Sequence, residues 1–192
     1  MKYKKLVWAG FIVMILVQLY MPASVIIERE KIIQQGKMWK FKTQPVDPND
    51  VFRGKYIYLN FTNSELIASN FNEVESGNAY IKLIEDTNGY AIPSEIHNEL
   101  PPKSNDYIQV KVTLNPFNLE DIDKEKSKVY FEYPFDRFYM EESKAPAAEL
   151  TYARATRDTL VATCAVVYVH NGQSVLTDVL IDGISVNDSA SD

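Results

Sequence analysis

The stretch that decides the fold reads Gln44-Pro-Val-Asp-Pro-Asn-Asp-Val-Phe-Arg-Gly-Lys-Tyr-Ile-Tyr-Leu-Asn-Phe61. Its first half is rich in proline, aspartate and asparagine, which favour turns. Its second half alternates, so that Ile57, Leu59 and Phe61 would share one face of a strand and bury it. The stretch therefore predicts an acidic turn that leads into a half-buried strand over residues 55–61.

Working outward, most of the chain beyond residue 36 carries similar strand signals. Apolar residues alternate over residues 107–114, and turn signals at residues 86–89 and 170–173 each separate two apolar runs, which predicts two hairpins. The polar, proline-containing residues 93–106 predict a loop. We expect a mainly β domain with one helix, of the α+β class, built as a compact antiparallel-rich sheet that is either barrel-like or a sandwich.

The single helix of this domain is predicted over residues 145–157. Ser143 would cap it, and Pro146 suits a first helical turn. A short last strand is expected at residues 184–186. Residues 187–192 are small and polar and predict a disordered tail.

An apolar segment at residues 6–27 precedes the domain and contains no charged side chain. About 20 such residues are enough to cross a bilayer as a helix. Lys2, Lys4 and Lys5 stand before it, which places residues 1–5 in the cytoplasm by the positive-inside rule. A cleaved signal peptide is the alternative, with Pro22-Ala23-Ser24 as a weak cleavage pattern.

Beyond the apolar segment, residues 28–36 continue the helical pattern and end at Gly36, a suitable C-cap. We expect a transmembrane helix at residues 6–27, a helical stalk at residues 28–36 and an exported β-rich domain at residues 37–186. The expected location is the bacterial inner (cytoplasmic) membrane, with the domain in the periplasm or outside the cell. The expected partner is the lipid bilayer, through the helix.

Charge and cysteine content exclude several functions. All 26 acidic residues lie beyond residue 27, whereas three of the 20 basic residues precede the apolar segment. So acidic a domain repels nucleic acid, which is not an expected partner. The single cysteine, Cys164, permits neither an intramolecular disulfide nor a thiolate metal cluster and predicts a small buried side chain. No cofactor and no metal site are expected.

The first candidate ligand-binding or structural motif is Asp47, Asp50, Arg53, Gly54 and Tyr56. Gly54 stands where the turn enters the strand, a place that often needs an unusual backbone conformation. Arg53 could be held by the nearby carboxylates for an anionic group, beside Tyr56. The simpler interpretation is that Arg53 pins the turn to the sheet.

The second motif is Asp136, Arg137 and Tyr139, within Tyr133-Pro-Phe-Asp-Arg-Phe-Tyr139. If the two motifs adjoin, two arginines among tyrosines would suit a carboxylate, a phosphate or a peptide end. The simpler interpretation makes the neighbouring phenylalanines core residues and Asp136–Arg137 an ion pair.

These motifs resemble those of a bacterial family, the GDYXXLXY proteins. The family pattern Gly-Asp-Tyr-x-x-Leu-x-Tyr falls on Gly54, Lys55, Tyr56, Leu59 and Phe61, with Lys55 in place of Asp and Phe61 in place of Tyr. The anchor, the residues 134–139 motif and the Val175–Gly183 end also resemble the family. The resemblance implies a membrane-anchored domain without an established activity, working beside a multi-span membrane protein.

The function expected from sequence is that of a single-pass membrane-anchored bacterial protein, a non-enzymatic accessory or interaction module of a membrane complex. The alternative is an exported domain that binds a small anion or peptide end at the two Asp/Arg motifs, and a third hypothesis is an unrecognised hydrolase. Enzyme activity is left uncertain and no catalytic residue is assigned, because His97 and His170 have no partner at a useful spacing.

Overall fold

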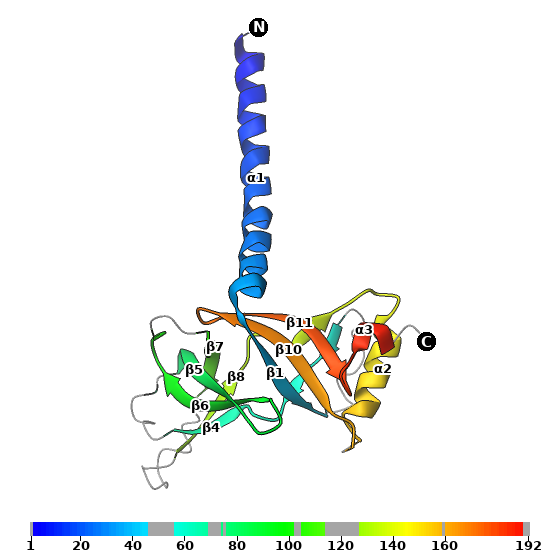
Figure 1. The fold of residues 1–192 in the computed structure, drawn as a ribbon. Coiled ribbons are helices and arrows are strands. Elements are labelled where there is room, and N and C mark those ends of the chain that lie inside the picture. The colour runs from blue at the N-terminus through cyan, green and yellow to red at the C-terminus, as the bar shows by residue number, and fades with distance from the viewer. Residues whose placement is uncertain are drawn as a thin grey trace.

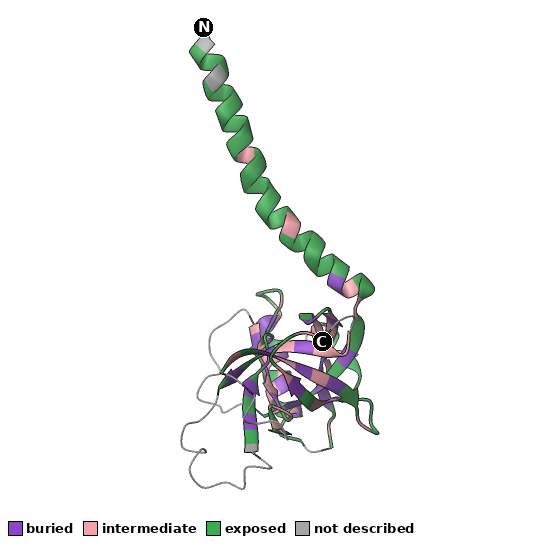
Figure 2. Ribbon diagram, turned by 90° about the vertical axis from the view of Figure 1, so that its left-hand side faces the viewer, coloured by how far each residue is buried: buried purple, intermediate pink, exposed green. Residues whose placement is uncertain are grey.

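A computed structural model (Figure 1) describes residues 2–45, 56–68, 74, 76–101, 105–113, 127–158 and 160–189. Its first element, α1 (Lys2–Gln35), is one helix that projects from the rest of the chain and continues through Pro22. None of the most apolar window of α1 is buried, and Figure 2 colours nearly all of this part of the helix exposed. By length and composition, α1 could span a membrane.

The remaining chain forms two five-stranded antiparallel sheets and a two-stranded ribbon. The first sheet has the order β12-β11-β10-β1-β3. Its strands are β1 (Lys37–Gln44), β3 (Asn60–Phe61), β10 (Thr163–His170), β11 (Gln173–Ile181) and β12 (Ile184–Ser185).

The second sheet has the order β4-β8-β7-β5-β6. It contains β4 (Glu65–Ala68), β5 (Gly77–Glu85), β6 (Ala91–His97), β7 (Tyr107–Thr113) and β8 (Ser127–Glu132). The ribbon pairs β2 (Tyr56–Tyr58) with β9 (Arg137–Tyr139).

The sheets join because β2, β3 and β4, which follow one another in the chain, belong to three different pairings. In addition, Gly172, at the tip of the β10–β11 hairpin, bridges to Ile108 of β7, and its carbonyl accepts a 2.8 Å hydrogen bond from the Gln109 amide. The result is a nearly closed, barrel-like antiparallel sheet, which confirms the predicted fold class.

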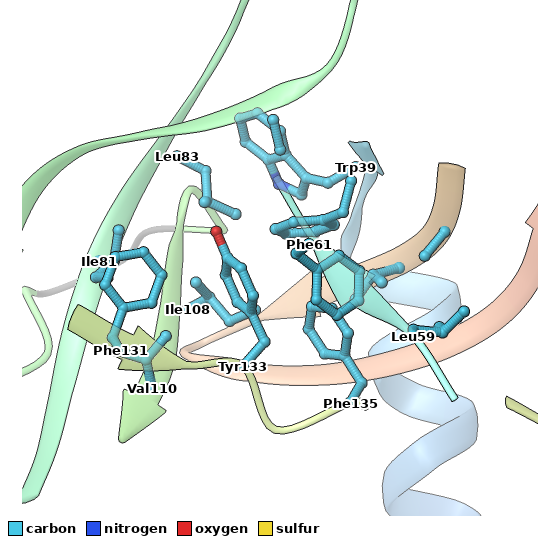
Figure 3. Close-up of a cluster of buried hydrophobic side chains, with 14 of the residues drawn as sticks. Trp39, Leu59, Phe61, Ile81, Leu83, Ile108, Val110, Phe131, Tyr133 and Phe135 are labelled. Atoms are coloured by element: carbon cyan, nitrogen blue, oxygen red, sulfur yellow. The ribbon is translucent and has the colours of Figure 1, made fainter. Parts of the chain in front are cut away.

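Aromatic side chains fill the centre of this domain. Figure 3 shows Tyr133 between Phe131 on one side and Phe61 and Phe135 on the other. Tyr133 stacks on Phe135, with ring centroids 5.3 Å apart and planes 18° apart, and meets Phe41 edge-on at 5.0 Å. Such edge-to-face and offset contacts add to the free energy gained by burying the rings.

The helices differ from the sequence predictions in two places. In α2 (Ala145–Ala155), the N-cap is Lys144, which makes no side-chain capping bond; Ser143 instead donates to Glu141 Oε1 at 2.8 Å, so Ser143 was wrongly predicted as the cap. The chain forms a short helix α3 (Val186–Ser189), which corrects the tail prediction for residues 187–189. The buried Val186 side chain holds α3 on the domain.

Three strand predictions also need correction. The predicted strand over residues 55–61 divides at Leu59, because the chain changes partner from β9 to β1 there; the Leu59 amide donates to the Asp136 carbonyl at 2.8 Å. The predicted loop at residues 93–106 is strand up to His97. Pro93 is tolerated because β6 is an edge strand with a register shift opposite Lys82–Leu83. The sequence did not predict β4.

Candidate functional site

The β2–β9 ribbon brings part of the two predicted motifs together. Tyr56 lies opposite Tyr139, and Tyr58 lies opposite Arg137, so these side chains share one face. The other face carries Ile57 and the facing residue of β9, Phe138, both buried in the core. Alternation along two short strands therefore places the polar motif residues outward.

The aromatic and charged side chains of this ribbon lie close to one another. The Tyr56 and Tyr139 rings have centroids 5.5 Å apart, and the Arg137 Cζ atom lies 5.1 Å from the Tyr56 ring centroid. Arg137 Nε is 3.6 Å from Asp136 Oδ2. A hydrogen bond with Tyr139 and the charge of Asp136 both raise the pKa of Arg137, which remains a fixed cation.

The ligand-site hypothesis required the two motifs to adjoin. The structure brings Tyr56 of the first motif next to Asp136, Arg137 and Tyr139 of the second. The other four predicted site residues, Asp47, Asp50, Arg53 and Gly54, lie outside the described residues. Whether these eight residues form a ligand site stays a prediction.

Asp136, Arg137 and Tyr139 line a cavity of about 860 Å³ at the base of α1, here called the stalk groove. One wall is a single helix face, because Val25, Glu28, Arg29 and Ile32 have the spacing of one stripe on an α-helix. Residues 134–139, residues 172–177 of the β10–β11 hairpin, Gln109 and Asn187 complete the lining.

The stalk is fixed to the domain by three kinds of contact. Ile32 is only 5% exposed. Glu28 Oε1 accepts a 2.8 Å hydrogen bond from Gln173 Nε2, and the Gln35 carbonyl accepts one of 3.1 Å from Asn105 Nδ2. These bonds hold the helix wall of the groove in register with the sheet wall.

Two arginines from different elements therefore face the same groove. Arg137 has Asp136 as its partner, at a distance longer than a direct hydrogen bond. Arg29 makes no hydrogen bond or ion pair within the part of the chain that the structure describes. Glu28 is bonded to the neutral Gln173 amide. The groove thus offers two cationic and two anionic side chains.

Arg29 and Gln173 were not identified from the sequence. The helical spacing of Val25, Glu28, Arg29 and Ile32 could have suggested a docked helix face. No local sequence pattern indicated that this helix face and residues 134–139 would line the same groove. Their shared position depends on how the β10–β11 hairpin crosses the domain.

The remaining chemistry-bearing side chains lie elsewhere. Cys164 is buried as predicted, and burial raises the pKa of its thiol, which makes the thiolate nucleophile scarce. His170 Nδ1 lies 3.1 Å from Asn105 Oδ1, near the stalk joint, and His97 lies 3.4 Å from Glu95 on the surface. Among the described residues, no three histidine, cysteine or carboxylate side chains gather as a metal site would require.

The fold and the groove define a barrel-like β-domain docked on a long apolar helix. The chain belongs to the GDYXXLXY protein family, whose model matches residues 18–179, from within α1 to within β11. No curated protein and no solved structure gives a significant match.

Proposed function

We propose that this chain is a single-pass membrane protein whose β-domain serves as a non-enzymatic interaction module of a membrane complex. The N-terminus would lie in the cytoplasm, and the domain on the opposite side of the bacterial inner membrane. The observation that carries the proposal is the docked stalk, since an apolar helix that runs unbroken into a fixed contact with the domain can hold that domain in one orientation.

Two further features support the proposal. The first is that none of the most apolar window of α1 is buried, and in a bilayer such a surface becomes lipid contact. The second is that three lysines precede the apolar segment, whereas all the acidic residues follow it. A multi-span membrane protein is the kind of partner that could bind a domain held in a fixed orientation at the membrane surface.

The test uses the full chain expressed in a bacterium. Cysteines introduced one at a time at Ser143 and Lys111, in a Cys164→Ala background, are expected to react with an impermeant maleimide in intact cells. After mild detergent extraction, the chain should co-purify with at least one membrane protein. Labelling only in broken cells would contradict the orientation. A lone monomer under conditions that preserve known complexes would contradict the partner role.

A second candidate function is the binding of a small anion or a peptide end by Arg137. It is favoured by the half-exposed Arg137 side chain held over Tyr56 and beside Tyr139. Arg137→Ala should leave the circular dichroism spectrum unchanged and abolish chemical-shift changes caused by phosphate or by a peptide carboxylate. If Arg137→Ala unfolds the domain, Arg137 is structural.

A further inference from the structure

The position of the stalk groove along α1 limits what can enter it. Val25 belongs to the last turn of the apolar segment, and Glu28 and Arg29 are the first charged residues after it. At 1.5 Å per residue, Val25 to Ile32 spans roughly 10 Å. The polar headgroup layer on each side of a bilayer is about 5–8 Å thick. Given the proposed anchoring, on which this inference rests, the groove lies at headgroup depth.

The charges of the groove limit the ligand further. Arg29 and Arg137 can each donate paired hydrogen bonds to a phosphate, and both line the groove, one from α1 and one from β9. Glu28 and Asp136 lie in the same lining and disfavour a group with net negative charge. A ligand that carries a phosphate and an ammonium group together complements both pairs.

The negative charge of the domain also favours a ligand without net charge. Because all the acidic side chains of the chain lie beyond the apolar segment, an anionic lipid surface is repelled by the domain as a whole. A zwitterionic headgroup has no net charge and avoids this cost. A primary ammonium is a better match than a quaternary one, since it can donate hydrogen bonds to the two carboxylates.

Apolar side chains lie beside these charged groups. Ile32, Phe135 and Phe138 are buried and line the groove, so that a glycerol backbone and the first acyl carbons would find apolar contact. Tyr139, which is 65% exposed, stands at the same wall. Tyrosine is suited to the boundary between headgroups and water.

We propose that the stalk groove binds one zwitterionic phospholipid with a phosphate and a primary ammonium, such as phosphatidylethanolamine, from the membrane that α1 crosses. Arg29 and Arg137 hold its phosphate, and Glu28 and Asp136 face its ammonium group. The bound lipid would fill the space between the stalk and the β-domain and tie the domain to the bilayer surface.

The test places the full chain in nanodiscs with equal amounts of phosphatidylethanolamine, phosphatidylcholine and phosphatidylglycerol. The lipids retained by the protein are then counted by native mass spectrometry. Phosphatidylethanolamine should be enriched, and Arg29→Gln or Arg137→Gln should each reduce the enrichment about tenfold, the effect of losing one charge-assisted contact. Lys31→Gln, which removes a stalk charge outside the groove lining, should leave the enrichment unchanged.

The other outcomes overturn the proposal in distinguishable ways. Equal retention of the three lipids, preference for phosphatidylglycerol, or indifference to Arg29→Gln would each contradict it. Displacement of a retained lipid by millimolar phosphoethanolamine or by a carboxylate-ended peptide, without lipid selectivity, would assign the groove to a soluble ligand. Failure of the chain to elute with the nanodiscs would reject the membrane anchoring itself. The Arg29 side chain is exposed and belongs to the stalk, so Arg29→Gln is expected to leave the β-domain folded.

Discussion

Two buried tyrosines carry hydroxyl groups in opposite situations. The Tyr133 hydroxyl donates a 2.8 Å hydrogen bond to the Asn63 carbonyl. The Tyr152 hydroxyl is also buried, but it has no hydrogen-bond partner of acceptable geometry among the described residues. Removing each hydroxyl should therefore have different consequences.

We expect Tyr133→Phe to lower the free energy of unfolding by about 1 kcal/mol, because the partly buried Asn63 carbonyl loses its donor. Tyr152→Phe removes a polar atom that makes no such bond and should leave stability unchanged or slightly higher. Urea unfolding of the full chain in detergent, followed by tyrosine and tryptophan fluorescence, measures both variants. A larger loss for Tyr152→Phe than for Tyr133→Phe would contradict the roles assigned to the two hydroxyls.

The same tyrosines predict an alkaline loss of stability. Burial raises the pKa of Tyr152 to about 12, and burial raises the pKa of Tyr133 as well. Above the unfolded-state pKa of about 10, the unfolded chain releases these protons while the folded chain keeps them. Stability is therefore full below about pH 10 and falls as the pH rises toward about 12.

For Tyr152 alone the loss is on the order of 2 kcal/mol, since each pKa unit corresponds to about 1.4 kcal/mol. Comparing urea midpoints at pH 8 and pH 11 should show a smaller decrease for Tyr152→Phe than for the parent chain. An identical decrease would mean that Tyr152 is not the group responsible.

At the scale of single residues, the sequence predicted much of the structure. The alternation of Ile57, Leu59 and Phe61 correctly identified three core residues, because burial of one face follows directly from a period of two. The role of Tyr133 as the centre of an aromatic cluster could not be predicted, because its contacts with Phe41 and Phe61 join strands that are far apart in the chain.

At the scale of elements, the β10–β11 hairpin has two functions. Its turn places Asn171 and Gly172 at φ values of 50° and 80°, as an Asn-Gly hairpin turn requires. Gly172 also packs directly on the second sheet, and a Cβ atom there would lie 2.8 Å from Tyr80 Cε1. A glycine at this position is needed both for the turn and for the contact between sheets.

Gly172→Ala should consequently destabilise the domain more than a substitution at a turn glycine with open surroundings. Gly89 is the matched control, with φ of 79° and nothing within 4 Å of the position that a Cβ atom would take. Gly89→Ala should cost roughly 1–2 kcal/mol for backbone strain. Gly172→Ala should cost about 1–3 kcal/mol more, from the clash with Tyr80. Equal unfolding free energies for the two variants would show that the sheet contact is loose.

The elements that the sequence did not predict are those whose state depends on a distant partner. β4 has only four residues and weak alternation, and it is a strand because it pairs with β8, far along the chain. Pro93 suggested a loop, yet it is accommodated where β5 and β6 shift register. The strand propensity of a short segment cannot show that β4 pairs with β8 or that β6 pairs with β5 through a register shift.

For the whole molecule, the orientation of the β-domain depends on the joint at Gly36. This residue leaves the helix as its amide donates to the Ile32 carbonyl at 2.8 Å, and the chain then enters β1. The sequence predicted the end of the helix but not the close packing around it. A Cβ atom at Gly36 would collide with the Ile32 carbonyl and lie 2.8 Å from the Val169 carbonyl, both of which are backbone atoms.

Gly36→Ala should therefore separate the stalk from β10, because backbone atoms cannot rotate away as a side chain does. We expect loss of the fixed angle between α1 and the domain, with the β-domain itself still folded. Spin labels on cysteines introduced at Lys31 and Lys111, in a Cys164→Ala background, would report a single narrow distance in the parent chain and a broad distribution in Gly36→Ala. Gly10→Ala, where a Cβ meets nothing within 4 Å, should leave the narrow distribution intact. If Gly36→Ala also left the narrow distance distribution intact, the close packing at Gly36 would not be needed. The stalk contacts of Ile32, Glu28 and Gln35 would then suffice to orient the domain.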